Sequence, residues 1–458
     1  MRWLWKGDNL FTNNGFVVRL RELRGKNVLV WGYGIEGKVM VDFLLKNKAT
    51  DKILVATSDK VSETRDNVEF ILETDILKND DIDVIIKSPG VSYYKSEIKI
   101  LEDRGVLITS MLNILLAEAA KYKNLKIIGV TGTKGKSTSV SVLNHMLNNL
   151  NHKSVALGNI GVPFISVIEK LDDYDYLVLE LSSYQIKNLA FDVDYAVILN
   201  LFPEHIGWHL SHENYFRDKL SILNHSRETI LNYGNKTTVE YMAKEKRGGN
   251  CIYFNTAVGF SVEDGCILNC GRKILDTKTL NNIRGEHIFM NICALLTILE
   301  KENIDPQLAL NTLKTFKCLN HRLEVFYEDR DKNTIFVDDS ISTVPESTIE
   351  ALKTFSTDEI FLILGGFDRQ QNFDELLDFI EKNKNVKKIF LLGQTGRRLS
   401  VQLGGEKSAF FETMEDLILA IKNHDLIGKT VLLSPASPSY DMFKNFEERG
   451  NRFKNLML

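Results

Sequence analysis

The sequence predicts an α/β protein with three domains: a Rossmann-like domain at residues 1–115, a central P-loop-type ATPase domain at 116–319, and a dinucleotide-binding-like α/β domain at 320–458. In each of the first two segments, an apolar run typical of a strand leads through a glycine-rich turn into a helical pattern. The third segment has its own alternation of strand and helix patterns, which is typical of a parallel sheet. A chain of 458 residues is long enough for roughly two to four domains.

Composition excludes several classes of protein. A net charge of −4 gives no broad basic surface for nucleic acid. No window approaches about 18 unbroken apolar residues, so no membrane-spanning helix is expected, and the N-terminus has no apolar run typical of a signal peptide. Cys266 and Cys270 form a close pair, but no second pair completes a zinc site, so we expect structural thiols. These features predict a cytoplasmic protein that binds neither nucleic acid nor membrane, and we expect a monomer.

The first glycine-rich turn, at 32–37, has the G-x-G-x-x-G spacing of dinucleotide-binding proteins. It follows a predicted strand at 27–31 and precedes a predicted helix that runs to about residue 46. The next predicted strand, 52–56, would end in an acidic residue if it bound the ribose of NAD, but it ends in Thr57-Ser58. This difference weakens the NAD interpretation and favours another nucleotide diphosphate at the same turn.

A further turn, Ser88-Pro89-Gly90, follows the predicted strand at 83–87. It would lie at the carboxyl end of that strand, where open α/β sheets bind ligands. On local grounds alone, a plain Pro-Gly turn explains these residues equally well.

The second glycine-rich turn predicts a phosphate-binding loop. A β-branched run at 126–130 leads into Gly132-Thr133-Lys134-Gly135-Lys136-Ser137-Thr138, and an amphipathic helical pattern follows. Backbone N–H groups of such a loop converge on an anion, Lys136 would reach the β- and γ-phosphates, and the Ser137 or Thr138 hydroxyl would bind Mg²⁺. The strict P-loop pattern has glycine where Val130 stands, so an ordinary glycine turn is the alternative interpretation.

Three further residues of the middle segment could carry chemistry. Glu180 ends a buried strand pattern at 176–180, where a lone carboxylate is costly unless a metal ion or another cation neutralises it. His205 follows the next predicted strand, and Lys219 lies on the helix after it. Taken singly, they would be a structural histidine and a surface lysine, but both lie near the expected nucleotide.

These motifs, in this order over nearly the whole chain, resemble the Mur ligase family, and specifically its glutamate-adding branch. The resemblance is carried by the loop through Thr138, by Glu180-Leu-Ser-Ser-Tyr-Gln185, by Asn200-Leu-Phe-Pro-Glu-His205 with Lys219, by His321-Arg322, and by the block Leu433–Gly450. The last block is the most specific, because it separates glutamate-adding members from their relatives. The resemblance implies an ATP-dependent amide ligase that adds D-glutamate to UDP-N-acetylmuramoyl-L-alanine through an acyl phosphate, in peptidoglycan precursor synthesis.

The resemblance also implies roles for individual residues. It implies catalytic roles for Lys136, His205 and Lys219. It implies two Mg²⁺ ions, one held by Ser137 and Glu180 and the other by His205 and by Lys219 as a carbamate. The residues implied to bind ATP are Gly132, Thr133, Lys134, Gly135, Lys136, Ser137, Thr138, Asn291 and Arg322. Those implied to bind the UDP-linked substrate are Ile35, Glu36, Thr57, Ser58, Ser88, Pro89, Gly90, Asn159 and His205. Those implied to bind glutamate are Thr343, Arg369, Ser439 and Phe446.

Several positions depart from the common family pattern. Ile341 stands where some members have a substrate-binding lysine, and Arg369 stands where many have lysine for the glutamate side chain. These two departures favour an L-glutamate-adding relative as the alternative. The sequence leaves open three other classes: a folylpolyglutamate synthetase-like ligase, an NAD oxidoreductase, and a nucleotide-binding module without catalysis.

Overall fold

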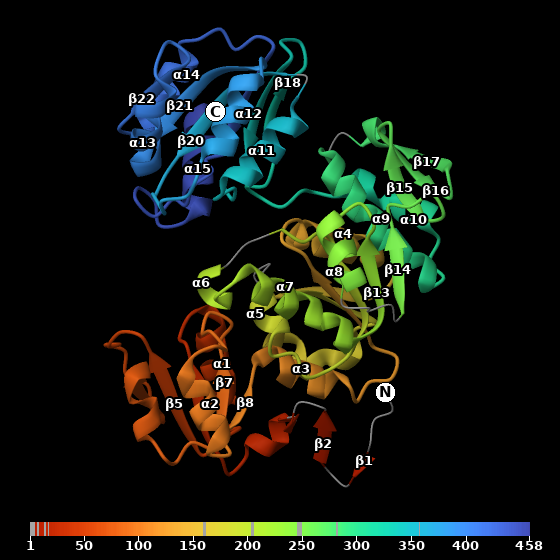
Figure 1. The fold of residues 1–458 in the computed structure, drawn as a ribbon, viewed down its shortest axis with the longest axis vertical. Coiled ribbons are helices and arrows are strands. Elements are labelled where there is room, and N and C mark those ends of the chain that lie inside the picture. The colour runs from red at the N-terminus through yellow and green to blue at the C-terminus, as the bar shows by residue number, and fades with distance from the viewer. Residues whose placement is uncertain are drawn as a thin grey trace. The chain divides into compact units, whose positions relative to one another are not determined.

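The computed structural model describes residues 5–6, 9–12, 15–16, 18–158, 162–202, 206–244, 250–280, 283–356 and 358–458. The chain divides into two compact units, Met1–Thr277 with Phe289–Leu313, and Lys278–Ile288 with Lys314–Leu458. The predicted α/β class is confirmed, because each unit contains at least one largely parallel sheet packed with helices (Figure 1). A further division of the first unit near residue 115 stays a prediction. No helix within the described ranges is both long enough and apolar enough to cross a membrane.

The described residues of the first unit contain a parallel five-stranded sheet with strand order β6-β5-β4-β7-β8. Its strands are β4 (Asn27–Trp31), β5 (Lys52–Thr57), β6 (Val68–Leu72), β7 (Val84–Lys87) and β8 (Leu107–Thr109). The helices that accompany them are α1 (Ile35–Lys46), α2 (Ser96–Asp103) and α3 (Met111–Ala119). Apolar side chains on both faces of the sheet are buried, as expected of parallel strands covered on both sides. The turn at 32–37 therefore lies between the central strand β4 and the start of α1.

A second parallel sheet follows in the same unit, with strand order β10-β11-β9-β12-β13-β14. Its strands are β9 (Lys126–Thr131), β10 (Ser154–Gly158), β11 (Tyr176–Glu180), β12 (Val193–Ile198), β13 (Ser226–Asn232) and β14 (Cys251–Phe254). The helices of this region are α4 (Lys136–Asn149), α5 (Ser183–Ile186), α6 (Ile206–His209), α7 (His212–Leu220), α8 (Lys236–Lys244), α9 (Glu286–Lys301) and α10 (Pro306–Thr312). Strand β9 lies between β11 and β12, so the ends of these three strands share one edge.

The hydrophobic pattern of the middle segment predicts alternating strands and helices to about residue 300, and this prediction is wrong for residues 251–276. An antiparallel meander of β15 (Phe260–Glu263), β16 (Cys266–Asn269) and β17 (Arg272–Asp276) follows β14 without a helix between them. Its turns, Asp264-Gly265 and Cys270-Gly271, all have positive φ, which is the conformation of a tight hairpin. The Asp-Gly pair is a hairpin signal that the sequence analysis overlooked.

Two smaller features also differ from the expectations. The sequence pattern predicts a helix over 291–301, but helix α9 begins five residues earlier, at Glu286, so the Asn291 side chain comes from its second turn. A short antiparallel sheet near the N-terminus was not predicted. It consists of β1 (Trp5–Lys6), β2 (Asn9–Thr12) and β3 (Gly15–Phe16).

The second unit is built on a six-stranded sheet with strand order β18-β19-β23-β20-β21-β22. Its strands are β18 (Glu324–Asp329), β19 (Thr334–Asp338), β20 (Glu359–Gly365), β21 (Val386–Leu392), β22 (Ser408–Phe411) and β23 (Lys429–Leu433). Its helices are α11 (Pro345–Thr354), α12 (Asp374–Lys382), α13 (Gly393–Leu403), α14 (Met414–Lys422) and α15 (Phe446–Met457). Helices α11 to α13 pack on one face and α14 and α15 on the other (Figure 1). The helices change faces around β23, and open α/β sheets bind ligands at such a point.

The turn at 32–37 generates the first testable prediction. A Cβ atom on Gly37 would lie 2.0 Å from the carbonyl oxygen of Gly32, whereas one on Gly34 would meet no atom within 4 Å. Gly37→Ala should therefore lower the free energy of unfolding by about 1–3 kcal/mol, because the backbone must shift to relieve the overlap. Gly34→Ala is the matched control. Urea unfolding followed by circular dichroism measures both, and equal midpoints for the two variants would contradict the prediction.

Candidate functional site

The glycine loop between β9 and α4 forms a tight cradle at the carboxyl edge of the second sheet. Gly135 has a φ of 84°, in the left-handed region that glycine adopts without strain. A Cβ atom on Gly135 would lie 2.3 Å from Nδ2 of Asn291, so the Asn291 side chain packs directly against the loop. Helix α4 begins at Lys136 and points its N-terminus at the same place, which favours an anion there.

Asn200, which the sequence analysis did not single out as a ligand-binding residue, holds the loop in shape. Its side-chain Oδ1 accepts a hydrogen bond from the backbone N–H of Lys134 at 2.8 Å, and its Nδ2 donates to the Lys134 carbonyl at 3.0 Å. The backbone N–H of Thr133 donates to the Asn200 carbonyl at 3.0 Å. A polar side chain just after the buried strand β12 was the available signal. The loop conformation is thus fixed by its own protein contacts before any ligand binds.

Two lysines converge on this loop. The Nζ of Lys136 donates hydrogen bonds to the carbonyl oxygens of Gly132 and Thr133, both at 3.0 Å. The Nζ of Lys219 donates to the same Gly132 oxygen at 3.0 Å, although this lysine is only 2% exposed. The Tyr215 ring lies 5.1 Å from the Lys219 ammonium, and its hydroxyl hydrogen-bonds the Thr133 hydroxyl at 2.9 Å. The structure therefore brings together two residues that stand 83 positions apart.

Glu180 lies at the same sheet edge. It is the last residue of β11, pairs in register with Val130 of β9, and is 3% exposed. Ser137 and Thr138 occupy the first turn of α4, so hydroxyl and carboxylate oxygens flank the loop. Oxygen ligands of this kind are the ones that Mg²⁺ prefers. Two further predicted residues, Asn159 and His205, lie outside the described residues.

The candidates for the first glycine turn surround the ends of β4, β5 and β7. Ser88 donates from Oγ to the Gly32 carbonyl at 2.9 Å, which fixes the Ser88-Pro89-Gly90 turn against the glycine turn. Thr57 and Ser58 hydrogen-bond to Asp59, through its carbonyl and its carboxylate respectively. The side chain of Ile35 is 80% exposed at the start of α1, where an apolar group could cover a ligand. These residues lie at or just beyond the carboxyl ends of neighbouring strands of the first sheet, and their role in binding a ligand stays a prediction.

Side chains of the second sheet's region also reach this turn. Gln185 donates from Nε2 to the Glu36 carboxylate at 3.3 Å, and burial raises the pKa of Glu36. Trp208 donates from its indole to the Pro89 carbonyl at 3.2 Å, and its ring lies 5.7 Å from the Lys87 ammonium. Burial lowers the pKa of Lys87 to about 8. Trp208 and Lys87 were not predicted as site residues.

The second unit gathers its candidates around one buried arginine, Arg449 on α15, which is 1% exposed. Its guanidinium donates to the Ser340 hydroxyl at 3.0 Å and to the Ser340 carbonyl at 2.8 Å, and further to the carbonyls of Gly365, Ser437 and Pro438. These acceptors belong to the loops that follow β19, β20 and β23. Burial lowers the pKa of Arg449 to about 10, which still leaves the group charged at neutral pH. Arg449 thus ties together the three loops at the point where the helices change faces.

The residues implied to bind glutamate lie on those loops or beside them. Ser439 is 1% exposed, and its Oγ accepts or donates no hydrogen bond among the described residues. The carbonyl of Phe446 accepts from the Ser340 hydroxyl at 2.8 Å, and the carbonyl of Thr343 accepts from the Gln371 amide at 3.3 Å. Arg369 is exposed, and its guanidinium lies 6.0 Å from the ring of Tyr440. Arg322 belongs to this unit, whereas Asn291 belongs to the other.

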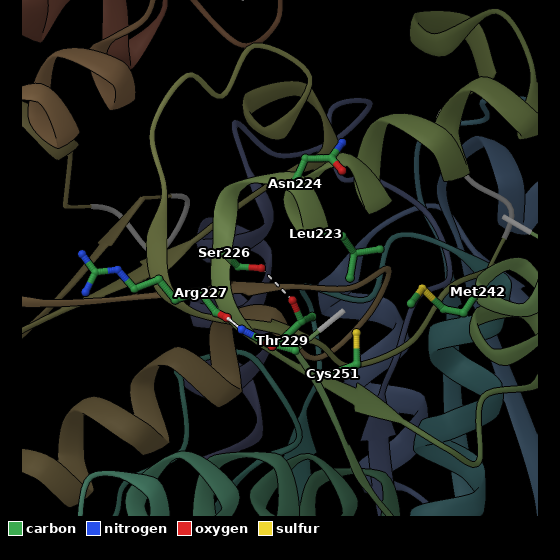
Figure 2. A pocket seen from close by; sticks show the side chains of 8 residues that line it. Leu223, Asn224, Ser226, Arg227, Thr229, Met242 and Cys251 are labelled. Carbon is green, nitrogen blue, oxygen red and sulfur yellow. Dashed lines mark hydrogen bonds between the residues drawn. The ribbon is translucent and has the colours of Figure 1, made fainter. Parts of the chain in front are cut away.

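Two other features of the described chain do not form a second site. His321, Glu324 and Asp338 could together hold a metal ion, but the Lys454 ammonium already lies 3.0 Å from Glu324 and 3.7 Å from Asp338. Figure 2 shows a pocket of about 380 Å³ beside the amino ends of β13 and β14, the opposite edge from the glycine loop. Polar groups on its wall, such as Ser226 and Thr229, bond to each other at 2.6 Å.

Comparison with known proteins gives consistent matches. Residues 130–296 match the family described as Mur ligase middle domain. A UDP-N-acetylmuramoylalanine–D-glutamate ligase of Thermoanaerobacter sp. (strain X514) is 31% identical over 94% of this chain and 98% of its own. A UDP-N-acetylmuramoyl-L-alanine–L-glutamate ligase of Micromonospora sp. is also 31% identical, over 95% of this chain and 97% of its own.

Solved structures of other ligases share the fold. The MurF ligase of Thermotoga maritima, solved in complex with ADP, aligns with a TM-score of 0.56 over 96% of this chain and 95% of its own. At 17% identity, this likeness supports the fold alone.

Proposed function

The chain belongs to the Mur ligase family, and we propose on that basis that it is an ATP-dependent ligase that joins glutamate to UDP-N-acetylmuramoyl-L-alanine. The observation that carries this proposal is the convergence of the glycine loop, Glu180 and Lys219 at one sheet edge. An NAD oxidoreductase or a simple nucleotide-binding module would need no such set of cationic and acidic groups beside a phosphate cradle. The relatives match nearly the whole chain, so the family accounts for the first glycine turn as well as for the loop between β9 and α4.

The residues at the sheet edge fit Mg·ATP. Only glycine fits at position 135, because a side chain there would collide with Asn291, and the resulting turn leaves the α4 N-terminus open to phosphate. Ser137 and the buried carboxylate of Glu180 supply the hydroxyl and carboxylate oxygens that Mg²⁺ prefers. When bound, the metal would neutralise charge on the transferred phosphoryl group. Lys136 would exchange its two carbonyl contacts for phosphate oxygens.

The proposed reaction brings negatively charged groups together, so the site must neutralise their charge. Phosphoryl transfer from ATP to the alanyl carboxylate joins two anions and gives an acyl phosphate, which turns a poor electrophile into a good one. The amine of glutamate then attacks the acyl carbon, the tetrahedral species collapses, and inorganic phosphate leaves as the amide forms. Positioning and electrostatic stabilisation do most of the work in such transfers. Lys136 is the residue that we assign to the transferring phosphoryl group.

We assign Lys219 to the second Mg²⁺ as a carbamate. A free ammonium repels a cation, whereas a carbamate is anionic and offers two oxygen ligands. The proximity of Lys136 supports this assignment, because both ammonium groups donate to one carbonyl oxygen. Carbamylation replaces that repulsion between like charges by attraction between opposite ones.

We assign glutamate to the loops at the carboxyl edge of the second unit's sheet, among Thr343, Arg369, Ser439 and Phe446. The buried Ser439 hydroxyl is placed beside loops that Arg449 holds together, and Arg369 can hold a carboxylate bidentately from its exposed position. We propose D-glutamate as the acceptor. L-glutamate is the second candidate, favoured by Arg369, by Ile341, and by the equal identity to the L-glutamate ligase of Micromonospora sp..

The first prediction from this proposal is an activity. The purified chain should release phosphate from ATP only when Mg²⁺, UDP-N-acetylmuramoyl-L-alanine and glutamate are all present, and turnover with D-glutamate should exceed that with L-glutamate. A coupled phosphate assay with each enantiomer measures both. Faster turnover with L-glutamate would overturn the assigned handedness. Phosphate release that does not depend on the UDP-linked substrate would overturn the ligase assignment itself.

The second prediction concerns Lys136. Lys136→Ala should lower kcat roughly a hundredfold or more, because a charged donor to the transferring phosphoryl group is lost. Its folding should be intact, because Asn200 still holds the loop and Gly135 still supplies the left-handed conformation when the two lysine contacts are lost. Lys153→Ala, an exposed lysine before β10, is the control for removing a charge. Near-normal kcat in a folded Lys136→Ala protein would refute the loop assignment.

The third prediction concerns the carbamate. Lys219→Ala should be nearly inactive, and a short carboxylate such as formate or acetate should restore part of the activity by replacing the carbamate oxygens. Chloride at the same ionic strength is the control, since it supplies no oxygen ligand. In ¹³C-bicarbonate, the unsubstituted protein should give a carbamate resonance that Lys219→Ala lacks. Absence of both the resonance and the rescue would count against the assignment.

A further inference from the structure

A buried network surrounds Asp218, the residue before Lys219 on α7. Asp218 is 1% exposed, and three groups contact its carboxylate. The hydroxyl of Tyr94 donates to Oδ2 at 2.8 Å, Nδ1 of His209 lies 2.8 Å from the same oxygen, and the Lys187 ammonium lies 3.0 Å from Oδ1. Both carboxylate oxygens are therefore engaged from three separate segments of the chain.

The network continues from His209 to the end of β11. Nδ1 of His209 faces the Asp218 carboxylate, whose oxygens accept, so this nitrogen donates the hydrogen bond. Nε2 lies 2.9 Å from the hydroxyl of Ser183, which opens α5 three residues beyond Glu180. The His209 carbonyl also accepts from the Asn214 amide at 2.8 Å. An unbroken series of hydrogen bonds thus connects α7 to the strand end that carries Glu180.

A hydrogen-bonded series of serine, histidine and aspartate, here Ser183, His209 and Asp218, is also found in the catalytic triads of hydrolases. Burial of these side chains excludes that role here. Ser183 is 2% exposed and His209 is 0% exposed, so no substrate carbonyl can reach the serine. Aromatic rings also pack against the histidine. The His209 ring stacks on that of Tyr184 at 5.4 Å and meets that of Tyr215 edge-on at 5.3 Å. A closed, fully bonded network of this kind fixes geometry rather than performing chemistry.

The geometry that it fixes is that of Lys219. Helix α7 has nine residues, and a helix this short takes its orientation from tertiary contacts. Asp218 and Lys219 are neighbours on its last turn, so holding the Asp218 carboxylate on two sides sets the rotation of that turn. The same rotation directs Lys219 to the Gly132 oxygen.

The Tyr94 bond brings the first sheet into this arrangement. Tyr94 follows the Ser88-Pro89-Gly90 turn by four residues, and Trp208 is hydrogen-bonded both to the turn and to the segment after it. The indole donates to Pro89, and Ser92 donates from Oγ to the Trp208 carbonyl at 3.0 Å. The Lys187 ammonium also lies 4.9 Å from the Tyr94 ring. The segment after a candidate UDP-binding turn is therefore bonded directly to the helix that carries Lys219.

We propose that Asp218 is a positioning residue for Lys219, and that Tyr94 couples it to the segment that binds the UDP-linked substrate. The hydrogen bond from Tyr94 holds α7 in the orientation that places Lys219 beside the glycine loop. This inference rests on the proposed function for the identity of the ligands, but the anchoring of α7 is a property of the protein by itself.

The chain offers a matched pair of variants to test it. Tyr94→Phe removes the hydroxyl that contacts Asp218, whereas Tyr93→Phe removes a neighbouring hydroxyl that contacts Glu102 instead. Hydrogen exchange read by mass spectrometry, on the full chain without substrates, measures the anchoring of α7. Peptides that cover residues 212–220 should exchange faster in Tyr94→Phe than in Tyr93→Phe. Equal exchange in the two variants would overturn the inference, whatever the activity.

Kinetics then separate positioning from a purely structural role. Tyr94→Phe should lower kcat about threefold to tenfold, as expected for loss of one hydrogen bond. It should also raise the Mg²⁺ concentration needed for half-maximal rate, and leave KM for glutamate unchanged. Asp218→Asn should lower kcat further, because it also loses the charge that pairs with Lys187. Equal kcat and Mg²⁺ dependence in Tyr94→Phe and Tyr93→Phe would overturn the positioning role. Faster exchange in Tyr94→Phe, with no ligase activity even in the unsubstituted protein, would uphold the anchoring and refute the proposed function instead.

Discussion

The carbonyl oxygen of Gly132 accepts hydrogen bonds from two ammonium groups, those of Lys136 and Lys219, each at 3.0 Å. Two like charges on one neutral oxygen are costly where solvent is largely excluded. The rest of the site is consistent with keeping both groups there: Asn200 fixes the loop and the Asp218 network orients the helix that carries Lys219. Such an arrangement is understandable if phosphate takes one ammonium group and carbon dioxide converts the other to an anion.

In the second unit, too, a buried cation is hydrogen-bonded to neutral oxygens: the guanidinium of Arg449. Its guanidinium is buried among four carbonyls and a hydroxyl, and no carboxylate lies within ion-pair distance of it among the described residues. Neutral oxygens satisfy the hydrogen bonds of the guanidinium but do not cancel its charge, although Asp338, Asp339 and Asp441 lie close enough to act on it electrostatically. Removing such a group would leave several carbonyls unpaired as well as losing a charge. The loops that meet at the carboxyl end of β23 are thus held together by one buried cation.

Sequence reasoning recovered the features that depend on local pattern. Predicted strands such as 27–31 and 52–56 agree with β4 and β5 to within one residue, because apolar runs bounded by glycine or polar residues mark parallel strands. The antiparallel meander at 260–276 was missed, since its strands are short and only the turn residues signalled it. The Asp218 network could not be predicted, because it joins residues from 94 to 218 whose proximity arises only when two sheets pack together. Singly, Tyr94 or His209 carries no signal that separates it from any buried polar side chain.

The two units divide the assigned residues by reaction step: one carries those assigned to phosphoryl transfer, and the other those assigned to glutamate. Every residue of the Asp218 network, and Lys136, Glu180 and Lys219 with it, belongs to the first unit, so the groups assigned to phosphoryl transfer form one preorganised set. The residues assigned to glutamate all belong to the second unit. An acyl phosphate is lost to water unless an amine is held beside it, so the acceptor must be bound when the intermediate forms. The two assigned sets thus stand on different units, and the unit that carries the glutamate set has a sheet and hydrophobic cores of its own.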